Sequence, residues 1–160
     1  MQEDNFLPML VGQDVFSGRY FVDVLQEDQQ GGHIKEKNIG KNDEYFLNRV
    51  NTEIYYYRSY TQGLQAAGSF SSVEAANKLV NSTLSRNSVF VDAMANGEYG
   101  YDVQEVLANF NSPTGKQAFK SSYTAQAFIR DTYGVLVVIK YNPKLSNKFF
   151  VLTAYPLNED

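Results

Sequence analysis

The sequence feature that most restricts the fold is an unbroken aliphatic run near the end of the chain, at residues 135–139. β-branched and aliphatic residues in succession predict a strand that is buried on both faces. Turn-forming residues follow at Asn142 and Pro143, and residues 149–155 are again rich in apolar side chains, which is typical of the returning strand of an antiparallel hairpin. The chain is therefore expected to have this hairpin at its centre.

Alternation along the second strand of this hairpin assigns its side chains to two faces, because successive side chains of a strand point to opposite sides. One face is expected to carry Phe150, Leu152 and Ala154, and the other Val151, Thr153 and Tyr155. Thr153 and Tyr155 should therefore point the same way, side by side.

Helical periodicity precedes the strands. Asn42 can cap a helix that begins at Asp43 and Glu44, whose charges suit the positive N-terminal end of a helix. Its apolar stripe is expected to contain Phe46, Leu47, Val50 and Ile54. Tyr45 and Arg49, four residues apart, would lie on the flank of that stripe.

A second helix is predicted from the capping-box spacing of Ser71 and Glu74, and it should stop at Arg86 and Asn87. Its apolar stripe contains Val73, Ala76, Val80 and Leu84. A short third helix is expected around residues 89–94. Beyond it the pattern changes to that of strands.

The region before Gly31 predicts a short helix or strand that ends in the polar run QEDQQGG. No repeat or linker divides the chain, and 160 residues suffice for one hydrophobic core. We expect an α+β fold in which N-terminal helices precede a central antiparallel sheet. Residues 1–30 would be an extension packed on a single domain formed by residues 31–160.

Composition excludes several classes of protein. The chain has no cysteine, which rules out disulfides, thiolate metal sites and a cysteine nucleophile. Its net charge of −4 argues against nucleic-acid binding through a generally basic surface, so any such contact should be local. No apolar run reaches membrane-spanning length and no basic-then-apolar leader is seen at the start. We therefore expect a soluble chain without its own secretion signal.

The stretch GGHIKEKNIGK, at residues 31–41, holds the only histidine, His33, and an asparagine five positions later, Asn38. Two glycines and the three lysines Lys35, Lys37 and Lys41 predict a mobile, locally cationic loop that can meet a phosphate. Neighbouring acidic residues dilute this charge, and a plain solvated loop is an equally good interpretation.

Consecutive tyrosines at residues 55–57, with Arg58 and Tyr60, raise the hypothesis of base stacking. Consecutive side chains point in different directions, so core packing is the favoured interpretation. Motifs for phosphate-binding glycine loops, zinc proteases, serine hydrolases and calcium loops are missing from the sequence. We expect neither a metal nor a cofactor.

The order of four segments, GGHIKEKNIGK, LNRV, AGSFSSVEAANKLV and VLTAYP, resembles the RNase A-like toxin domains at the C-termini of bacterial contact-dependent growth inhibition proteins (CdiA type) and related polymorphic toxins. The resemblance spans residues 31–156. It implies a kidney-shaped RNase A-like α+β fold without disulfides. It also implies a ribonuclease that is exported as the C-terminal part of a larger surface or secreted protein, acts in the cytoplasm of a target bacterium, and is neutralised by a cognate immunity protein.

The resemblance also implies roles for particular residues. His33 matches one family histidine, Arg49 the active-site arginine, and Thr153 and Tyr155 a paired threonine and tyrosine. Asn38 stands where the family usually has a second histidine, which we take to be its acid/base group. Lys37 and Lys41 are expected to bind substrate.

The departure at Asn38 leaves the chemistry open, because an amide cannot exchange protons near neutral pH. In one version His33 acts from the neighbouring position, since it is the only imidazole available. In the other, Asn38 leaves a weak or silent homologue that binds RNA or the immunity protein; Asn38 as an introduced inactivating change is a further alternative. Plainer interpretations make His33 a solvated residue, Arg49 an ion-pair partner of Glu53, and the threonine and tyrosine ordinary strand residues.

The favoured prediction is a metal-independent, monomeric ribonuclease that produces a 2′,3′-cyclic phosphate by transesterification, with structured RNA such as tRNA as substrate. Its rival from another class is a catalytically dead binding module. A third hypothesis is an unrelated α+β interaction domain whose matching segments are a coincidence.

Overall fold

The computed structural model describes residues 20–56, 61–122 and 124–159. Five helices are present among them: α1 (Val24–Gln29), α2 (Ile34–Asn38), α3 (Asp43–Thr52), α4 (Val73–Arg86) and α5 (Ser88–Ala95). The strands of these ranges are β1 (Ile54–Tyr56), β2 (Thr61–Gly63), β3 (Ala66–Ser69), β4 (Val103–Asn109), β5 (Gly115–Phe119), β6 (Phe128–Thr132), β7 (Gly134–Tyr141) and β8 (Phe149–Leu157). The predicted α+β class is confirmed.

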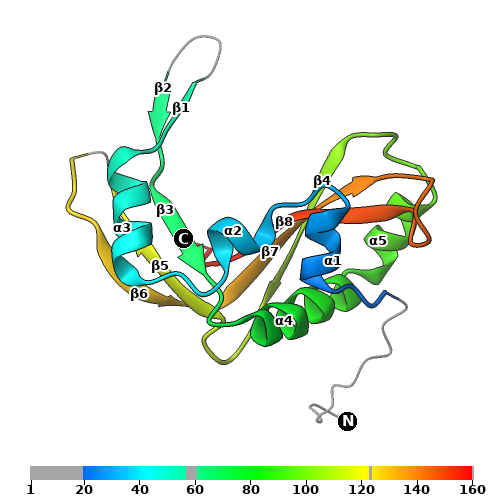
Figure 1. Ribbon diagram of the computed structural model, residues 1–160, viewed down its shortest axis with the longest axis horizontal. Helices are drawn as coiled ribbons and strands as arrows, with labels where there is room; N and C mark the ends of the chain where they lie inside the picture. Colours follow the sequence, from blue (N-terminus) through cyan, green and yellow to red (C-terminus); the bar gives the residue numbers. More distant parts are fainter. Residues whose placement is uncertain (1–19, 57–60, 123, 160) are drawn as a thin grey trace.

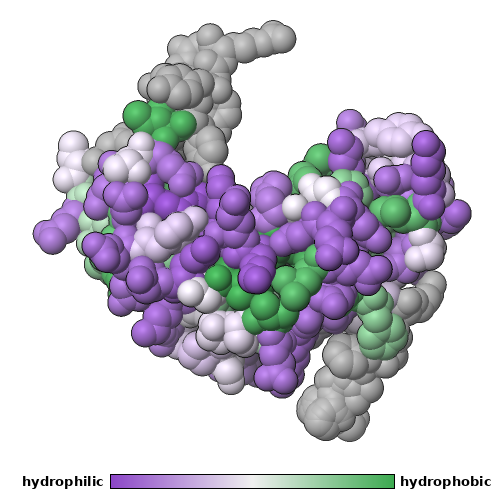
Figure 2. All heavy atoms as spheres, in the orientation of Figure 1, coloured by the Kyte–Doolittle hydropathy of each residue, from purple (hydrophilic) through white to green (hydrophobic). Residues whose placement is uncertain are grey.

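The strands form two three-stranded antiparallel sheets, ordered β4-β7-β8 and β3-β5-β6, and a separate β1-β2 ribbon. The first sheet lies with α1, α4 and α5, the second lies with α3, and α2 lies between the two groups (Figure 1). The surface is hollowed between the resulting lobes (Figure 2). The predicted hairpin is present as β7 and β8, with β7 in the middle of its sheet.

Each lobe has its own hydrophobic core. The larger core joins α4, α5 and the inner face of the β4-β7-β8 sheet, and it includes Val80, Leu84, Val137 and Ile139. The smaller core lies under α3 and consists of Phe46, Val50, Ala67 and Ala118. Since the two cores are separate, the surface between them is free to form a cleft.

Two glycines allow the sheets to approach each other at the end of β8. A Cβ atom on Gly68 would lie 2.7 Å from the Pro156 carbonyl oxygen, and one on Gly115 would lie 2.4 Å from the Ser69 carbonyl oxygen and 2.9 Å from the Pro156 ring. Real Cβ atoms do not come this close to backbone atoms. Small residues at both positions therefore bring β3 and β5 against β8.

The cap of α3 is as predicted, because the Asn42 side chain accepts a hydrogen bond from the Tyr45 backbone N–H at 2.8 Å. The predicted apolar stripe is partly wrong. Phe46 and Val50 are buried, whereas Ile54 lies in β1 and is 52% exposed. The helix ends at Thr52, so the helical spacing no longer applies to Ile54.

The second predicted helix, α4, stops at Asn87 as expected, but its cap is Ser72 rather than Ser71. The Ser72 hydroxyl accepts from the Ala75 backbone N–H at 3.0 Å, three residues along. Two adjacent serines made the sequence pattern ambiguous by one position. The short third helix is present as α5.

The polar run QEDQQGG was expected to end a short helix or strand, and this prediction is confirmed, because α1 ends within the run at Gln29. Most of the run lies within α1, which starts after the cap Asp23 and is bounded by Gln30. The helix forms because Val24 and Glu27 are both buried against the rest of the protein. Within the described ranges no helix is long and apolar enough to cross a membrane.

A β-bulge in β8 changes the predicted assignment of faces. Thr153 pairs with Val138 and Val151 pairs with Ile139, so Leu152 is an extra residue between two neighbouring pairs. Alternation is interrupted there, and Val151 faces the larger core instead of sharing a face with Thr153. Thr153 and Tyr155 remain on a common face, opposite to that core.

Candidate active site

The predicted mobile loop at residues 31–41 contains a short helix, which is a correction. Residues Ile34–Asn38 form α2, and its first N–H groups are bound by a side chain from the preceding helix. Asp28 accepts from the Ile34 N–H at 2.6 Å and from the Lys35 N–H at 2.9 Å. The first turn of α2 is thus fixed by hydrogen bonds to Asp28 and by the packing of Ile34, which is fully buried.

The segment that contains α1 and the start of α2 is hydrogen-bonded to the bulge of β8. The His33 N–H donates to the Leu152 carbonyl at 2.9 Å, and the Glu27 carboxylate accepts from the Val151 N–H at 2.8 Å. Burial is the main cause that raises the pKa of Glu27, which is only 5% exposed. Two backbone groups around the bulge thus find their partners in α1 and at the start of α2.

The candidate site residues come together in one cavity of about 420 Å³. Its walls include His33 and Asn38 from the α2 segment, Arg49 from α3, and Thr153 and Tyr155 from β8. These residues are up to 122 positions apart (155 − 33). The fold therefore assembles in one place the group that the sequence marked as candidates, together with Lys37.

Asn38 lies at the buried end of this group and is 6% exposed. Its amide donates to the Thr153 hydroxyl at 3.0 Å and to the Ala154 carbonyl at 3.1 Å. An amide in this position can orient Thr153 and donate hydrogen bonds, but it cannot carry a proton from one reacting atom to another. His33, by contrast, is exposed at the start of α2.

Arg49 is held by Glu53, four residues along the same helix. Arg49 Nε lies 2.6 Å from one carboxylate oxygen of Glu53, and Nη2 lies 3.0 Å from the other. The hydrogen bond from Arg49 holds the pKa of Glu53 below its ordinary value, and the nearby charge of Lys37 contributes. The predicted ion pair is present, and it orients the guanidinium while offsetting part of its charge.

Among the lining residues that sequence reasoning missed are Gln117 and Phe119 of β5 and Arg130 of β6. Nothing in the local sequence distinguished them, because their relation depends on the pairing of Gln117 with Arg130 across the sheet. Apart from His33, the ionisable side chains that line the cavity among the described residues are all cationic, namely Lys37, Arg49 and Arg130. An acidic chain thereby presents a local site for an anion.

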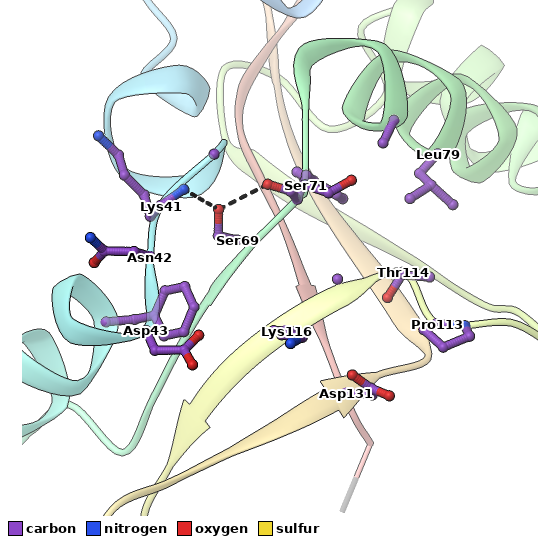
Figure 3. Close-up of a pocket in the computed structure, with 15 residues that line it drawn as sticks. Lys41, Asn42, Asp43, Ser69, Ser71, Leu79, Pro113, Thr114, Lys116 and Asp131 are labelled. Atoms are coloured by element: carbon purple, nitrogen blue, oxygen red, sulfur yellow. Dashed lines mark hydrogen bonds between the residues drawn. The ribbon is translucent and has the colours of Figure 1, made fainter.

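Lys41, which we expected to bind substrate beside Lys37, lines a different cavity of about 600 Å³. Figure 3 shows this cavity between the start of α3, β3 and the strands β5 and β6. The Lys41 backbone N–H donates to the Ser69 hydroxyl at 3.0 Å, and its ammonium lies 4.8 Å from the centre of the Tyr45 ring. The structure therefore separates the two lysines.

Two further expectations concern features outside this site. The side chains of the tyrosine cluster at residues 55–57 and 60 lie outside the described residues, so core packing and base stacking both stay predictions. In the parts of the chain that the structure describes, no group of three or more histidine, aspartate or glutamate side chains is arranged to hold a metal ion.

Comparison with known proteins identifies the family of the chain. A family model described as the bacterial CdiA-CT RNAse A domain matches residues 32–156. The crystal structure of a CdiA-CT/CdiI complex from Y. kristensenii 33638 contains a similar chain, with a TM-score of 0.63 and 21% identity over 78% of this chain and 98% of that one. No curated protein matches the chain. The family match extends from the α2 segment to Pro156 of β8, and the chain belongs to the bacterial CdiA-CT RNase A domain family.

Proposed function

We propose that this chain is a metal-independent ribonuclease toxin domain, and that the cavity between α2, α3 and β8 is its active site. The observation that carries the proposal is the gathering of His33, Arg49, Thr153 and Tyr155 on one cavity with cationic walls. RNA is a polyanion, and a guanidinium can bind two oxygens of one phosphate at once. Family membership supports the same class of activity.

The proposed reaction is a transesterification that involves only RNA atoms and protons. The 2′-oxygen attacks the adjacent phosphorus as its proton passes to His33. The bond from phosphorus to the 5′-oxygen breaks, and that oxygen takes a proton from the Tyr155 hydroxyl. The products are a 2′,3′-cyclic phosphate and a free 5′-hydroxyl, and proton exchange with water restores both side chains.

Arg49 would stabilise the charge that develops on the phosphate oxygens, which is the largest contribution in many reactions of this type. Thr153, held by the Asn38 amide at 3.0 Å, would donate a hydrogen bond to one of those oxygens. Structured RNA such as tRNA is the proposed substrate class. A cognate immunity protein is the proposed partner, since the similar solved chain is part of a CdiA-CT/CdiI complex.

A second candidate function is a binding module that has lost its acid/base group. It is favoured by one observation: a buried amide, Asn38, makes two hydrogen bonds to β8 in the wall of the cavity. Loss of a general acid or base costs about 10²- to 10⁴-fold in rate. Such a domain would still bind RNA or an immunity protein.

Digestion of purified total RNA and tRNA in the presence of EDTA tests both candidates. The native chain is compared with His33→Ala, Tyr155→Phe and Asn38→His, and Asn48→His is a matched control because Asn48 is exposed on α3 outside the cavity. Cleavage by the native chain that disappears in His33→Ala supports the ribonuclease.

Cleavage that appears only in Asn38→His, and not in Asn48→His, supports the binding module. If none of the variants cleaves RNA, and none binds RNA or an immunity protein, both proposals are wrong. A cyclic phosphate at the new 3′ end, detected by its resistance to phosphatase before acid treatment, identifies the reaction type.

A further inference from the structure

A large aromatic side chain at the start of β6 is exposed beside the candidate active site. Phe128 is the first residue of this strand, and 49% of its surface is open to solvent. A single exposed apolar residue is ordinary by itself. Its position relative to the cavity decides what it can bind.

The register of the sheet places Phe128 on the same face as the cavity. Phe119 of β5 pairs with Phe128, and Gln117 pairs with Arg130 two positions along. Directly opposite residues of an antiparallel pair point to the same side of the sheet, and so do residues two apart on one strand. Since Gln117, Phe119 and Arg130 line the cavity, Phe128 shares their face and is the next pair along it.

The two phenylalanine rings orient each other. Their centres are 5.9 Å apart and their planes meet at 78°, an edge-to-face arrangement in the range that aromatic pairs prefer. The guanidinium carbon of Arg130 lies over the Phe119 ring, 3.8 Å from its centre. Phe128 is therefore positioned by a ring that belongs to the cavity wall, while much of its own surface stays open to solvent.

An unpaired nucleobase fits such a surface. Bases of single-stranded RNA stack on aromatic side chains, and every base can do so because each has a flat π-face. The cationic walls of the cavity suit the phosphates of the same strand. A strand with a phosphate in the cavity can thus place a neighbouring base on the sheet beside it, where Phe128 lies.

We propose that Phe128, oriented by Phe119, is a stacking platform for an unpaired base of the RNA strand whose phosphate occupies the cavity. This inference rests on the proposed function, because it assigns a base subsite next to the same cavity. The bases of a regular duplex are already stacked on one another, so the platform selects single strands and loops. Within a structured RNA, the bound segment is a loop or an unpaired end.

The test measures binding rather than cleavage, so that the open question at Asn38 does not affect it. The first ligand is a fluorescent single-stranded octanucleotide whose 2′-hydroxyls are methylated, which removes the nucleophile. The second has the same number of phosphates but abasic residues throughout, so it reports phosphate binding alone. Dissociation constants are measured at several salt concentrations for the native chain and Phe128→Ala. Tyr101→Ala is the matched control, because Tyr101 is 67% exposed and lies outside the cavity.

Phe128→Ala is expected to bind the octanucleotide about 5- to 150-fold more weakly, which corresponds to the loss of one stacked base. The slope of log K against log salt should not change, because no phosphate contact is lost. Affinity for the abasic strand should also be unchanged. Tyr101→Ala should bind both ligands as the native chain does.

A tryptophan at the platform reports stacking directly. The chain has no tryptophan, so Phe128→Trp introduces a single indole, which should keep the affinity for the octanucleotide. Its emission should be quenched by the octanucleotide and unaffected by the abasic strand, while Tyr101→Trp should show no quenching with either. This variant also serves if Phe128→Ala unfolds, which thermal melts would reveal.

Three results would overturn the inference. If Phe128→Ala binds the octanucleotide as Tyr101→Ala does, while Arg49→Gln binds more weakly, the platform is wrong and the proposed function stands. The platform is also wrong if Phe128→Ala changes the oligomeric state in analytical ultracentrifugation and leaves RNA affinity unchanged, since Phe128 is then a contact between copies of the chain. If the native chain does not bind the RNA at all, the proposed function fails and the platform fails with it.

Discussion

Replacement of Glu27 by glutamine and by alanine separates two effects of this buried carboxylate on stability: the hydrogen bond that it accepts and the negative charge that it buries. Glu27 accepts from the Val151 N–H at 2.8 Å and is 5% exposed. Glutamine keeps an oxygen that can accept the same hydrogen bond and removes the charge. Alanine removes both, and it leaves the Val151 N–H without the partner that it has in the native protein.

The structure sets the size and sign of the expected effects. A buried backbone donor without a partner costs about 1–3 kcal/mol, so Glu27→Ala should lower the melting temperature by about 2–12 °C for a chain of this size. Burial, the main cause, raises the pKa of Glu27 above its ordinary value of 4.5. The folded protein therefore binds this proton more tightly than the unfolded chain does, and the associated stability is present below pH 4.5 and lost as the pH rises through the folded pKa.

At pH 7 Glu27→Gln should consequently be at least as stable as the native protein. Its free energy of unfolding should also fall less as the pH rises above 4.5. Urea unfolding followed by circular dichroism between pH 4 and 8 measures both effects. Glu36→Gln is the control, since Glu36 is exposed on α2 and should change stability by no more than about 0.5 kcal/mol. If Glu27→Gln is as unstable as Glu27→Ala, the negative charge itself is needed and the reasoning is refuted.

Three more variants change residues of the α1–α3 region that carries His33, Asn38 and Arg49 of the candidate active site. A Cβ atom on Gly32 would lie 2.5 Å from the Val151 carbonyl oxygen, so Gly32→Ala should lower stability by about 1–3 kcal/mol, and an unchanged melting temperature would contradict this. Glu53→Gln should strengthen RNA binding because the Glu53 carboxylate no longer offsets part of the charge of Arg49, and weaker binding would show that orientation matters more than charge. The pKa of Glu53 is lowered in the folded protein, so its pair with Arg49 stabilises the fold above the ordinary pKa of glutamate, and this stabilisation is lost as the pH falls through the folded pKa. The free energy of unfolding should therefore decrease less steeply with falling pH in Glu53→Gln than in the native protein. Asn42→Ala removes the cap of α3 and should cost about 1 kcal/mol in urea unfolding, with a smaller loss in Asn42→Asp.

The local pattern of polar and apolar residues was enough to predict the helices and strands that depend on residues close together in the sequence. The α3 cap and the α4 stripe depend on positions three or four apart, and the β7-β8 hairpin depends on two apolar runs joined by a turn. The fold class followed from these elements. Ile54 shows the limit of this reasoning, because a correct spacing was extended past the last residue of the helix.

Long-range contacts account for what the sequence did not reveal. The α2 segment was expected to be a loop because the carboxylate that accepts from its first N–H groups, Asp28, belongs to the preceding helix rather than to its N-cap position. Arg130 went unnoticed because Gln117 and Phe119 lie on the adjacent strand, 13 and 11 positions away in the chain (130 − 117 and 130 − 119). The candidate residues themselves came from a resemblance in their order, and their roles remain predictions.

The bulge at Leu152 shifts the alternation of β8 by one residue, so the residues before and after it follow different face assignments. One inserted residue changes which later side chains are presented to the cavity and which earlier ones are presented to the core, while composition and hydropathy remain almost the same. A homologue that gains or loses a single residue here could exchange its cavity-facing set without any substitution. Alignments of this strand are therefore informative only when the position of the extra residue is matched first, and designs that graft the Thr153 and Tyr155 pair onto another sheet need the bulge as much as the pair.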